Sequence, residues 1–526
     1  MVKVDGDSLT IEDVNEVALK NQKAALPTDK KFWERLEKSR KFLMGYISTG
    51  VPTYGVTTDF GDSCYKQISV EKAGELQRTI VAYHGIGLGK NFDHETGRAV
   101  LVCRLNGNVK GGHSAIRPEL ARKMLELLNK DVIPVIPQLG SVGASGDLTP
   151  LSYVAAVIMG QRKVYYKGKI VPTMKAFKAE KIEPLLIEAK EGLAIMNGTS
   201  VMTAVASLAI KKAERLAKIS DFLSAVTSEI TRGKDTPFVA KVSQLKNHKG
   251  QSESAAYIYK IVKNSKRVYK YEEFLKTQIE KLDGRTFVKQ SNKNKIQDRY
   301  SIRCAPQING VYRDTLAMAR QWITEEINSA NDNPLVDIDS GRVYNTGNFY
   351  GGHICAACDY MRTALANISD LSDKQAEIII DGKFSGLPDN LTPRIKDTDP
   401  RAGLRLGFKA AQITISAIRG EVQSYCYPIS VTSAPTEAIN QDKVSMGTIS
   451  ARKFAEQIDL VYLQFATHLL AAVQAVDLAG YDDFSPFTKE VHDAVRKMSK
   501  IVKDDRPLDA EATKVAEWLK TTELFA

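Results

Sequence analysis

The chain has 526 residues, of which 43% are hydrophobic and 26% are charged, and its formal net charge is +11 at pH 7. This is the composition of a globular protein with ample material for a large core. The N-terminal residues MVKVDGDSLTIEDVNEVALK are mixed and charged, and no run approaches about 18 uninterrupted apolar residues. We therefore expect no membrane span, no membrane partner and a cytoplasmic location.

Cysteine and lysine usage exclude two further classes of protein. Six scattered cysteines are too few for a disulfide scaffold. The densest basic stretch, residues 260–299, also contains acidic residues, and its bases do not alternate with aromatic residues. This pattern favours a solvated polar face or loop, and we expect no nucleic-acid partner.

Roughly the first 200 residues predict a compact segment of mixed secondary structure. Short periodic pieces alternate with glycine-rich turns such as YHGIGLG (83–89) and NGNVKGGH (106–113). The stretch GIGLGK (85–90) lacks the G-x-G-x-x-G spacing and does not fit a Walker loop, so we infer neither a dinucleotide nor a nucleoside triphosphate.

Small residues are concentrated in GSVGASGDLTP (140–150), between two apolar stretches. Taken alone, this stretch predicts a glycine-rich turn with Asp147 or Thr149 as a helix N-cap. The triad Ala144-Ser145-Gly146 permits a second interpretation. In a tight turn the Gly146 nitrogen can approach the Ala144 carbonyl carbon and close a five-membered ring. Loss of two waters, one of them from Ser145, then leaves a methylene conjugated to a carbonyl, which is a strong electrophile.

Long helices are predicted where proline is missing, between Leu185 and Thr236 and between Thr436 and Ser485. Within these spans apolar residues recur with helical period, and the second span is apolar nearly all round, which is typical of a buried helix. We expect an N-terminal domain over 1–220 and a bundle of long helices over 221–526. The HICAAC stretch (353–358) has no second motif to complete a zinc site, so buried small residues on a helix are favoured over a metal.

Seven ordered motifs resemble those of the aromatic amino acid ammonia-lyase and aminomutase family. They are TYGVTTDFGD (53–62), GASGDLTPLSYVA (143–155), MNGTS (196–200), QDRYSIRCAPQ (297–307), EINSANDNPLV (326–336), GNFYGG (347–352) and NQDKVSMG (440–447). The resemblance implies a mainly α fold of the ammonia-lyase/fumarase-like architecture. It also implies a methylidene-imidazolone (MIO) electrophile that Ala144, Ser145 and Gly146 form autocatalytically, with no added cofactor. Members are homotetramers whose composite sites draw on three chains, and the same is expected of this chain.

The resemblance also implies roles for individual residues. Tyr54 matches the catalytic base, and a tyrosine serves as a base when neighbours lower its pKa of about 10. Arg303 matches the residue that binds the substrate carboxylate, a task suited to a bidentate guanidinium. The other matched residues are Tyr300 as a second catalytic tyrosine, Asn197 beside the electrophile and carboxylate, Gln297 as a hydrogen-bonding support, and Asn333 and Phe349 in the pocket wall.

Substrate choice depends on a few positions. His84 lies where histidine-acting and several tyrosine-acting members carry His, and an imidazole can hydrogen-bond a phenol; a structural histidine is the alternative. Gln441 replaces the Glu of histidine ammonia-lyases, which argues against histidine. Lys409 and Glu437 resemble a pair of phenylalanine-acting members, expected to be buried together. Two departures from the family, Asp59 in place of Gly and a large Tyr83, are expected to reshape the pocket.

The predicted reaction is therefore elimination of ammonia from L-tyrosine, with L-phenylalanine second and histidine third. An aminomutase, which returns the ammonia to the β-carbon, would share the same site and differ in how long the loop bearing Tyr54 stays closed. A catalytically silent homologue kept as a structural protein is disfavoured, because Tyr54, Ser145 and Arg303 are all present.

Overall fold

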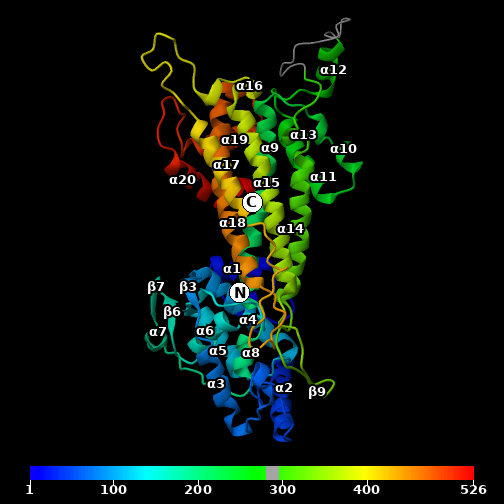
Figure 1. Cartoon of the computed structure of the whole chain (residues 1–526), viewed down its shortest axis with the longest axis vertical. Helices are drawn as coiled ribbons and strands as arrows, with labels where there is room; N and C mark the ends of the chain where they lie inside the picture. Colours follow the sequence, from blue (N-terminus) through cyan, green and yellow to red (C-terminus); the bar gives the residue numbers. More distant parts are fainter. Residues whose placement is uncertain (280–294) are drawn as a thin grey trace. The chain divides into compact units, whose positions relative to one another are not determined.

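The computed structural model describes residues 1–279 and 295–526 (Figure 1). The chain divides into two compact units. The first comprises residues 1–211, 318–359 and 428–455, and the second comprises 212–317, 360–427 and 456–526. The change of unit after Lys211 falls within helix α9 (Ser200–Ile230), as does the predicted boundary near residue 220. Part of the predicted basic stretch, residues 280–294, lies outside the described residues.

The first unit contains the shorter helices and the strands. Its complete helices are α1 (Ile11–Leu19), α2 (Lys30–Ser48), α3 (Ala73–Tyr83), α4 (His94–Val109), α5 (Pro118–Asn129), α6 (Leu148–Ile158), α7 (Thr173–Glu180) and α8 (Glu191–Met196). Short 3-10 turns are η1 (Gly61–Tyr65), η2 (Val70–Lys72) and η3 (Lys110–Gly112). This alternation of short helices, strands and turns matches the mixed structure that the sequence predicts.

This unit also contains four small sheets. A parallel pair joins β1 (Val2–Lys3) to β2 (Ala24–Ala25), and an antiparallel pair joins β3 (Leu88–Asn91) to β5 (Pro137–Leu139). A three-stranded antiparallel sheet has the order β4 (Ile133–Pro134), β6 (Lys163–Tyr166), β7 (Lys169–Pro172). The last pair is β8 (Leu335–Asp337) with β9 (Arg342–Tyr344). The strands are too short to form a layer, so helices make the core.

Helix α4 is the central element of the first unit. Nearly all of its side chains are buried, and it packs against α1, α5 and α8. Helix α6, whose sequence LTPLSYVAAVI is apolar on every face, is also buried and packs against α3 and α8. Because α6 begins directly after residues 144–147, this packing fixes the position of the small-residue turn.

Four long helices have residues in both units: α9, α14 (Ala305–Ile327), α15 (Gly352–Ile380) and α18 (Gly447–Ala479). The second unit also contains α10 (Ala240–Gln244), α11 (Lys249–Val262), α12 (Tyr271–Ile279), α13 (Tyr300–Arg303), α16 (Gly382–Ser385), α17 (Lys409–Ser424), α19 (Pro486–Arg496) and α20 (Asp509–Thr521). Its 3-10 turns are η4 (Thr236–Phe238), η5 (Asp389–Leu391), η6 (Tyr481–Asp483) and η7 (Glu523–Phe525). The predicted bundle of long helices, and the mainly α fold, are confirmed.

Polar side chains join the long helices inside the second unit. Ser369 of α15 donates to Gln464 of α18 at 2.5 Å, and Gln375 of α15 donates to Ser224 of α9 at 2.9 Å. Tyr312 of α14 donates to the Ala213 carbonyl of α9, also at 2.9 Å. The helices of this unit therefore pack as one bundle (Figure 1).

Helix α18 is long and apolar enough to cross a membrane by composition alone, but 78% of its most apolar window is buried inside the protein. It is thus the buried helix that its all-round apolar pattern predicts. Cys355 and Cys358 of the HICAAC stretch are likewise buried on α15. In the described part of the chain, no cluster of three or more His, Cys, Asp or Glu side chains could hold a metal ion.

Candidate active site

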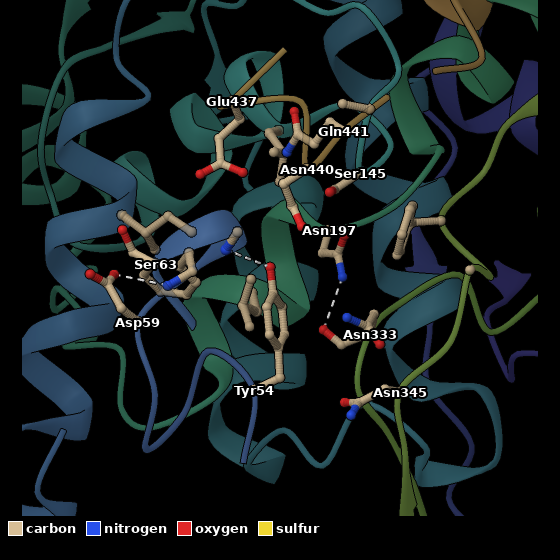
Figure 2. A pocket seen from close by; sticks show the side chains of 18 of the residues that line it. Tyr54, Asp59, Ser63, Ser145, Asn197, Asn333, Asn345, Glu437, Asn440 and Gln441 are labelled. Atoms are coloured by element: carbon tan, nitrogen blue, oxygen red, sulfur yellow. Dashed lines mark hydrogen bonds between the residues drawn. The ribbon is translucent and has the colours of Figure 1, made fainter. Parts of the chain in front are cut away.

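A cavity of about 870 Å³ lies in the first unit (Figure 2). Its walls come from the loop that follows α2, the end of α3, the turn before α6, the end of α8, residues 333–349 and residues 437–443. The lining residues include many of those predicted from the motifs, namely Tyr54, His84, Ala144, Ser145, Asn197, Asn333, Phe349, Glu437 and Gln441. The two departures from the family, Asp59 and Tyr83, line it as well.

Four predicted residues do not line this cavity and belong to the second unit: Gln297, Tyr300, Arg303 and Lys409. The side chain of Tyr300 is 71% exposed, and Gln297 and Lys409 are also exposed. The Arg303 guanidinium carbon lies 4.4 Å from the centre of the Tyr300 ring. The motifs predict that these residues belong to a site composed from several chains, and within one chain they do not line the cavity.

The turn carrying Ser145 is pressed against the segment that follows α8. Gly146 has a φ of +73°, and a Cβ at this position would overlap the Gly198 carbonyl. The Asp147 amide donates to that same carbonyl at 2.7 Å. A Cβ on Gly198 would in turn overlap the Arg104 guanidinium and lie 2.5 Å from the Asn331 carbonyl oxygen. The close passage of the two segments therefore requires glycine on both sides.

Residues at the start of α18 hold the opposite side of the turn. The Ser445 amide donates to the Gly143 carbonyl at 3.2 Å, and the Met446 amide donates to the Val142 carbonyl at 2.9 Å. The hydroxyl of Thr448 donates to the carboxylate of Asp147. The turn is thus enclosed by two parts of the chain that are far apart in sequence.

Asp147 occupies the N-cap position of α6, as the sequence suggested, but its side chain does not cap that helix. Its Oδ2 accepts the amides of Val201 and Met202, the first turn of α9, at 2.9 Å each. Its Oδ1 accepts the Ser141 hydroxyl at 3.0 Å. Burial raises the pKa of Asp147, and these hydrogen bonds oppose the shift by favouring the carboxylate.

Arg104, which the sequence analysis missed, supports the floor of the site. Its fully buried guanidinium donates to the Ala194 carbonyl through Nε at 3.0 Å and to the Asn331 side-chain oxygen at 2.8 Å. Burial lowers its pKa to about 10. The signal in the sequence is a single arginine within the apolar run AVLVCRL of α4, because a charge there must find partners inside the core.

Asn197 combines one satisfied and one unsatisfied polar atom. Its Nδ2 donates to the Asn333 carbonyl at 2.9 Å, as Figure 2 shows. Its Oδ1 is buried and has no hydrogen-bond partner among the described residues. A buried acceptor without a partner is costly, so this oxygen is available to a group formed on the neighbouring turn or to a substrate.

The Tyr54 hydroxyl faces the cavity and accepts the Gly61 amide at 3.0 Å (Figure 2). Burial raises the pKa of Tyr54, and the nearby Glu437 and Asp59 carboxylates raise it further, although the Gly61 hydrogen bond opposes the shift. The expectation of a lowered pKa is therefore not met within one chain. Lys443 is the cationic side chain among the described residues that line the cavity, and it is exposed.

His84 caps the end of α3 and lines the cavity. Its Nδ1 lies 3.5 Å from the Thr149 hydroxyl, and burial lowers its pKa to about 4. The imidazole is therefore neutral near pH 7 and able to donate or accept a hydrogen bond. The adjacent Tyr83 ring has its centre 4.3 Å from that of His84, and burial raises the Tyr83 pKa to about 12.

A tight hairpin presents Gln441 and Glu437 to the cavity. The Thr436 hydroxyl donates to the Gln441 side-chain oxygen at 2.7 Å. Glu437 is exposed within this chain, and both of its carboxylate oxygens lie 3.0 Å from the Asp62 amide nitrogen. Within this chain both Lys409 and Glu437 are exposed, and Glu437 binds a backbone amide, so their predicted pairing stays a prediction.

These residues fit an electrophile made from the backbone of the turn. Gly146 carries no side chain to obstruct ring closure, and the packing around it excludes one. Ser145 lines the cavity, so a methylene formed from it would face a bound molecule. The unpartnered Asn197 oxygen lies in the same cavity wall. Chemically, the arrangement combines an electrophile, a phenol and a neutral imidazole around one space.

Comparison with known proteins agrees with this chemistry. The family model for aromatic amino acid lyases matches residues 9–497. Histidine ammonia-lyase from Geobacillus sp. (strain WCH70) is 34% identical to this chain over 99% of it and 96% of the relative. The MIO-dependent tyrosine 2,3-aminomutase from Streptomyces globisporus is 36% identical over 99% and 96%. The solved structure of Pantoea agglomerans phenylalanine aminomutase aligns with a TM-score of 0.93 at 32% identity and covers 100% of both chains.

The close passage at Gly198 leads to a prediction about maturation. In Gly198→Ala the added methyl group would overlap Arg104, so the segment should move away from Gly146 and the turn should lose its compression. We expect the variant to retain the two waters that the wild type loses, as measured by intact-protein mass spectrometry. Gly45→Ala on α2, where a Cβ meets nothing within 4 Å, is the control and should lose both waters. Complete water loss in Gly198→Ala would contradict the proposed role of this contact.

Proposed function

This chain belongs to the aromatic amino acid lyase family, and from that membership we propose that it eliminates ammonia from L-tyrosine to give the trans-arylacrylate coumarate. The family is MIO-dependent, so the electrophile comes from Ala144, Ser145 and Gly146 of the chain itself. The observation that carries the proposal is the position of Ser145. It stands in the wall of a cavity that Tyr54 and His84 also line, on a turn packed against Gly198.

The chemical roles follow from this arrangement. When formed, the electrophile makes the substrate amino group a leaving group. Tyr54 then removes the β-proton through its phenolic oxygen, and the Gly61 amide stabilises the phenolate by donating to that oxygen. Asn197 offers its unpartnered Oδ1 to the reacting groups. The loop that carries Tyr54 forms one side of the cavity.

Two residues support tyrosine as the substrate. The neutral His84 imidazole can hydrogen-bond a phenolic hydroxyl, a group that phenylalanine lacks. Gln441 is neutral, and Thr436 already holds its side-chain oxygen, so it offers no charge to an imidazole substrate. Phenylalanine stands second. Histidine stands third, although several curated relatives are named histidine ammonia-lyases.

A tyrosine 2,3-aminomutase is the second candidate function. Its support is the similarity to the Streptomyces globisporus enzyme of that name, together with a Tyr54 loop that is fastened to the cavity wall through Glu437. An aminomutase must retain the acrylate and ammonia long enough to rejoin them at the β-carbon. NMR of the products distinguishes the two outcomes, because a β-amino acid that accumulates before free ammonia identifies the mutase.

We also propose that the active form is a homotetramer with composite sites. Burial raises the pKa of Tyr54 in the single chain, so a working base needs a cationic group from elsewhere. Arg303 and Tyr300 do not line the cavity of their own chain. A neighbouring chain that supplied them would provide both the cation and the carboxylate-binding guanidinium. A cytoplasmic location remains part of this proposal.

The first test of this proposed function concerns the reaction itself. Purified wild-type protein incubated with each aromatic amino acid should develop the ultraviolet absorbance of an arylacrylate, and most rapidly with tyrosine. Ser145→Ala has no β-hydroxyl to eliminate, so it should fold, keep its unmodified mass and lose several orders of magnitude of activity. An active enzyme with an unmodified mass would refute the proposal. Efficient release of urocanate from histidine would refute the argument from Gln441.

The second prediction concerns His84. In His84→Phe a buried phenolic hydroxyl would lose its partner, so tyrosine turnover should fall by roughly ten- to a hundredfold. Phenylalanine turnover should hold or rise, because the new wall is apolar. Steady-state kinetics on both substrates give the comparison. Equal losses on both would show that His84 is structural.

The third prediction concerns assembly. Light scattering at assay concentration should give the mass of four chains, and Arg303→Ala should lose activity even though Arg303 does not line the cavity of its own chain. Mixed tetramers provide the sharper measurement, since inactive Tyr54→Phe and Arg303→Ala chains should regain partial activity together if their residues come from different chains. An active monomer would refute the composite site.

A further inference from the structure

Glu437 contacts the loop that carries Tyr54, here called the Tyr54 loop (residues 54–66). Both carboxylate oxygens of Glu437 lie 3.0 Å from the Asp62 amide nitrogen. The base of the loop is closed by its own backbone, where the Asp59 amide donates to the Lys66 carbonyl at 3.0 Å. The contact with Glu437 therefore adds a second attachment, to a residue far away in sequence.

Two successive amides of the loop serve two different side chains. The Gly61 amide donates to the Tyr54 hydroxyl at 3.0 Å, and the next amide, of Asp62, donates to Glu437. Adjacent peptide groups share a Cα and are individually planar, so fixing one restricts the other. The carboxylate that holds Asp62 thereby also limits the directions in which Gly61 can present its N–H to the phenol.

The contact leaves no room for a side chain at residue 61. Gly61 has a φ of +57°, and a Cβ placed on it would overlap the carboxylate of Glu437. Glycine thus allows both the backbone conformation and the close approach of the carboxylate. The contact therefore requires both a glycine at residue 61 of the loop and the carboxylate of Glu437 on the facing hairpin.

The backbone that presents Glu437 is in an unfavourable conformation. Glu437, Ala438 and Ile439 have φ values of +53°, +53° and +65°, and three successive residues with a Cβ rarely occupy the left-handed region. Hydrogen bonds in both directions between the backbones of Thr436 and Gln441, at 3.1 and 3.3 Å, close this hairpin. Strain of this kind persists where the surrounding structure enforces it, and it marks segments with a specific task.

We infer that Glu437 is a positioning residue, whose carboxylate holds the Tyr54 loop against the cavity by accepting the Asp62 amide. The left-handed hairpin aims the carboxylate at the loop, and Gly61 allows the approach. The effect on turnover rests on the proposed function, whereas the effect on the loop does not. The charge has a second consequence, since Glu437 is one of the groups that raise the pKa of Tyr54. The carboxylate that holds the loop thus also disfavours the phenolate form of Tyr54.

Hydrogen–deuterium exchange of the assembled full-length protein tests the contact directly. In Glu437→Ala the amides of residues 54–66 should exchange roughly ten- to a hundredfold faster, the size expected for a lost hydrogen bond to a charged group. Glu437→Gln keeps an acceptor oxygen and should lie between the wild type and Glu437→Ala. Asp442→Asn removes a charge from the same cavity wall without touching the loop, and should leave its exchange unchanged. Wild-type exchange in Glu437→Ala would overturn the inference.

A double-mutant cycle with Gly61→Ala sharpens the test. In the wild-type background the added methyl group overlaps the Glu437 carboxylate, so the loop should open. In the Glu437→Ala background that overlap is gone, and the same substitution should change exchange much less. If the two single effects simply multiply in the double variant, the two residues act independently and the inference fails.

Turnover provides a readout that separates positioning from a general loss of structure. Glu437→Ala should still lose both waters by intact mass, while its kcat falls and Glu437→Gln recovers part of the loss. If the wild type makes no arylacrylate from any aromatic amino acid, the proposed function fails and the exchange result still stands. If arylacrylate forms but loop exchange does not respond to Glu437, the inference alone fails.

Discussion

The structure of the site depends on one close passage of backbone past backbone. Gly146 and Gly198 meet without side chains, and the Asp147 amide is bound to the Gly198 carbonyl at 2.7 Å. Any side chain at either position would separate the two segments. Neighbouring groups keep the two segments together. The Arg104 guanidinium packs against Gly198, and the Ser445 amide, just before α18, donates to the Gly143 carbonyl.

Buried charged side chains hold many of the backbone groups around this contact in place. Asp147 and Arg104 are fully buried, and Lys190 pairs with Asp332 at 2.7 Å with both side chains inaccessible to solvent. Burial lowers the pKa of Lys190, although the attraction to Asp332 opposes the shift. Apolar residues could fill the same volume with less desolvation cost. Hydrogen bonds with fixed directions, however, define the position of a carbonyl or an amide, which apolar packing cannot do. These buried charges therefore fix the positions of the backbone groups that support the cavity.

Sequence reasoning succeeded where local pattern determines structure. The long buried helices follow from their apolar period, and the Ala144-Ser145-Gly146 turn follows from the need for small residues. Within one chain Lys409 and Glu437 are both exposed, so their expected pairing stays a prediction about the assembled protein. A motif predicts the role of a residue but not which chain supplies it, and Arg303 and Tyr300 do not line the cavity of their own chain. Asp147 was interpreted as a local cap because its partners on α9 lie more than fifty residues away.

The enclosure of the Ser145 turn has a consequence for biosynthesis. The turn itself is complete early in translation, but Ser445, Met446 and Thr448, which hold its outer side, are among the later residues to be made. While the ribosome is still adding those residues, the nascent chain cannot enclose the turn. Ring closure, if it requires that enclosure, is therefore a late event, and a chain that terminates before α18 would carry the full Ala-Ser-Gly triad without the means to convert it. In that case the order of synthesis keeps an unfinished chain free of the electrophile.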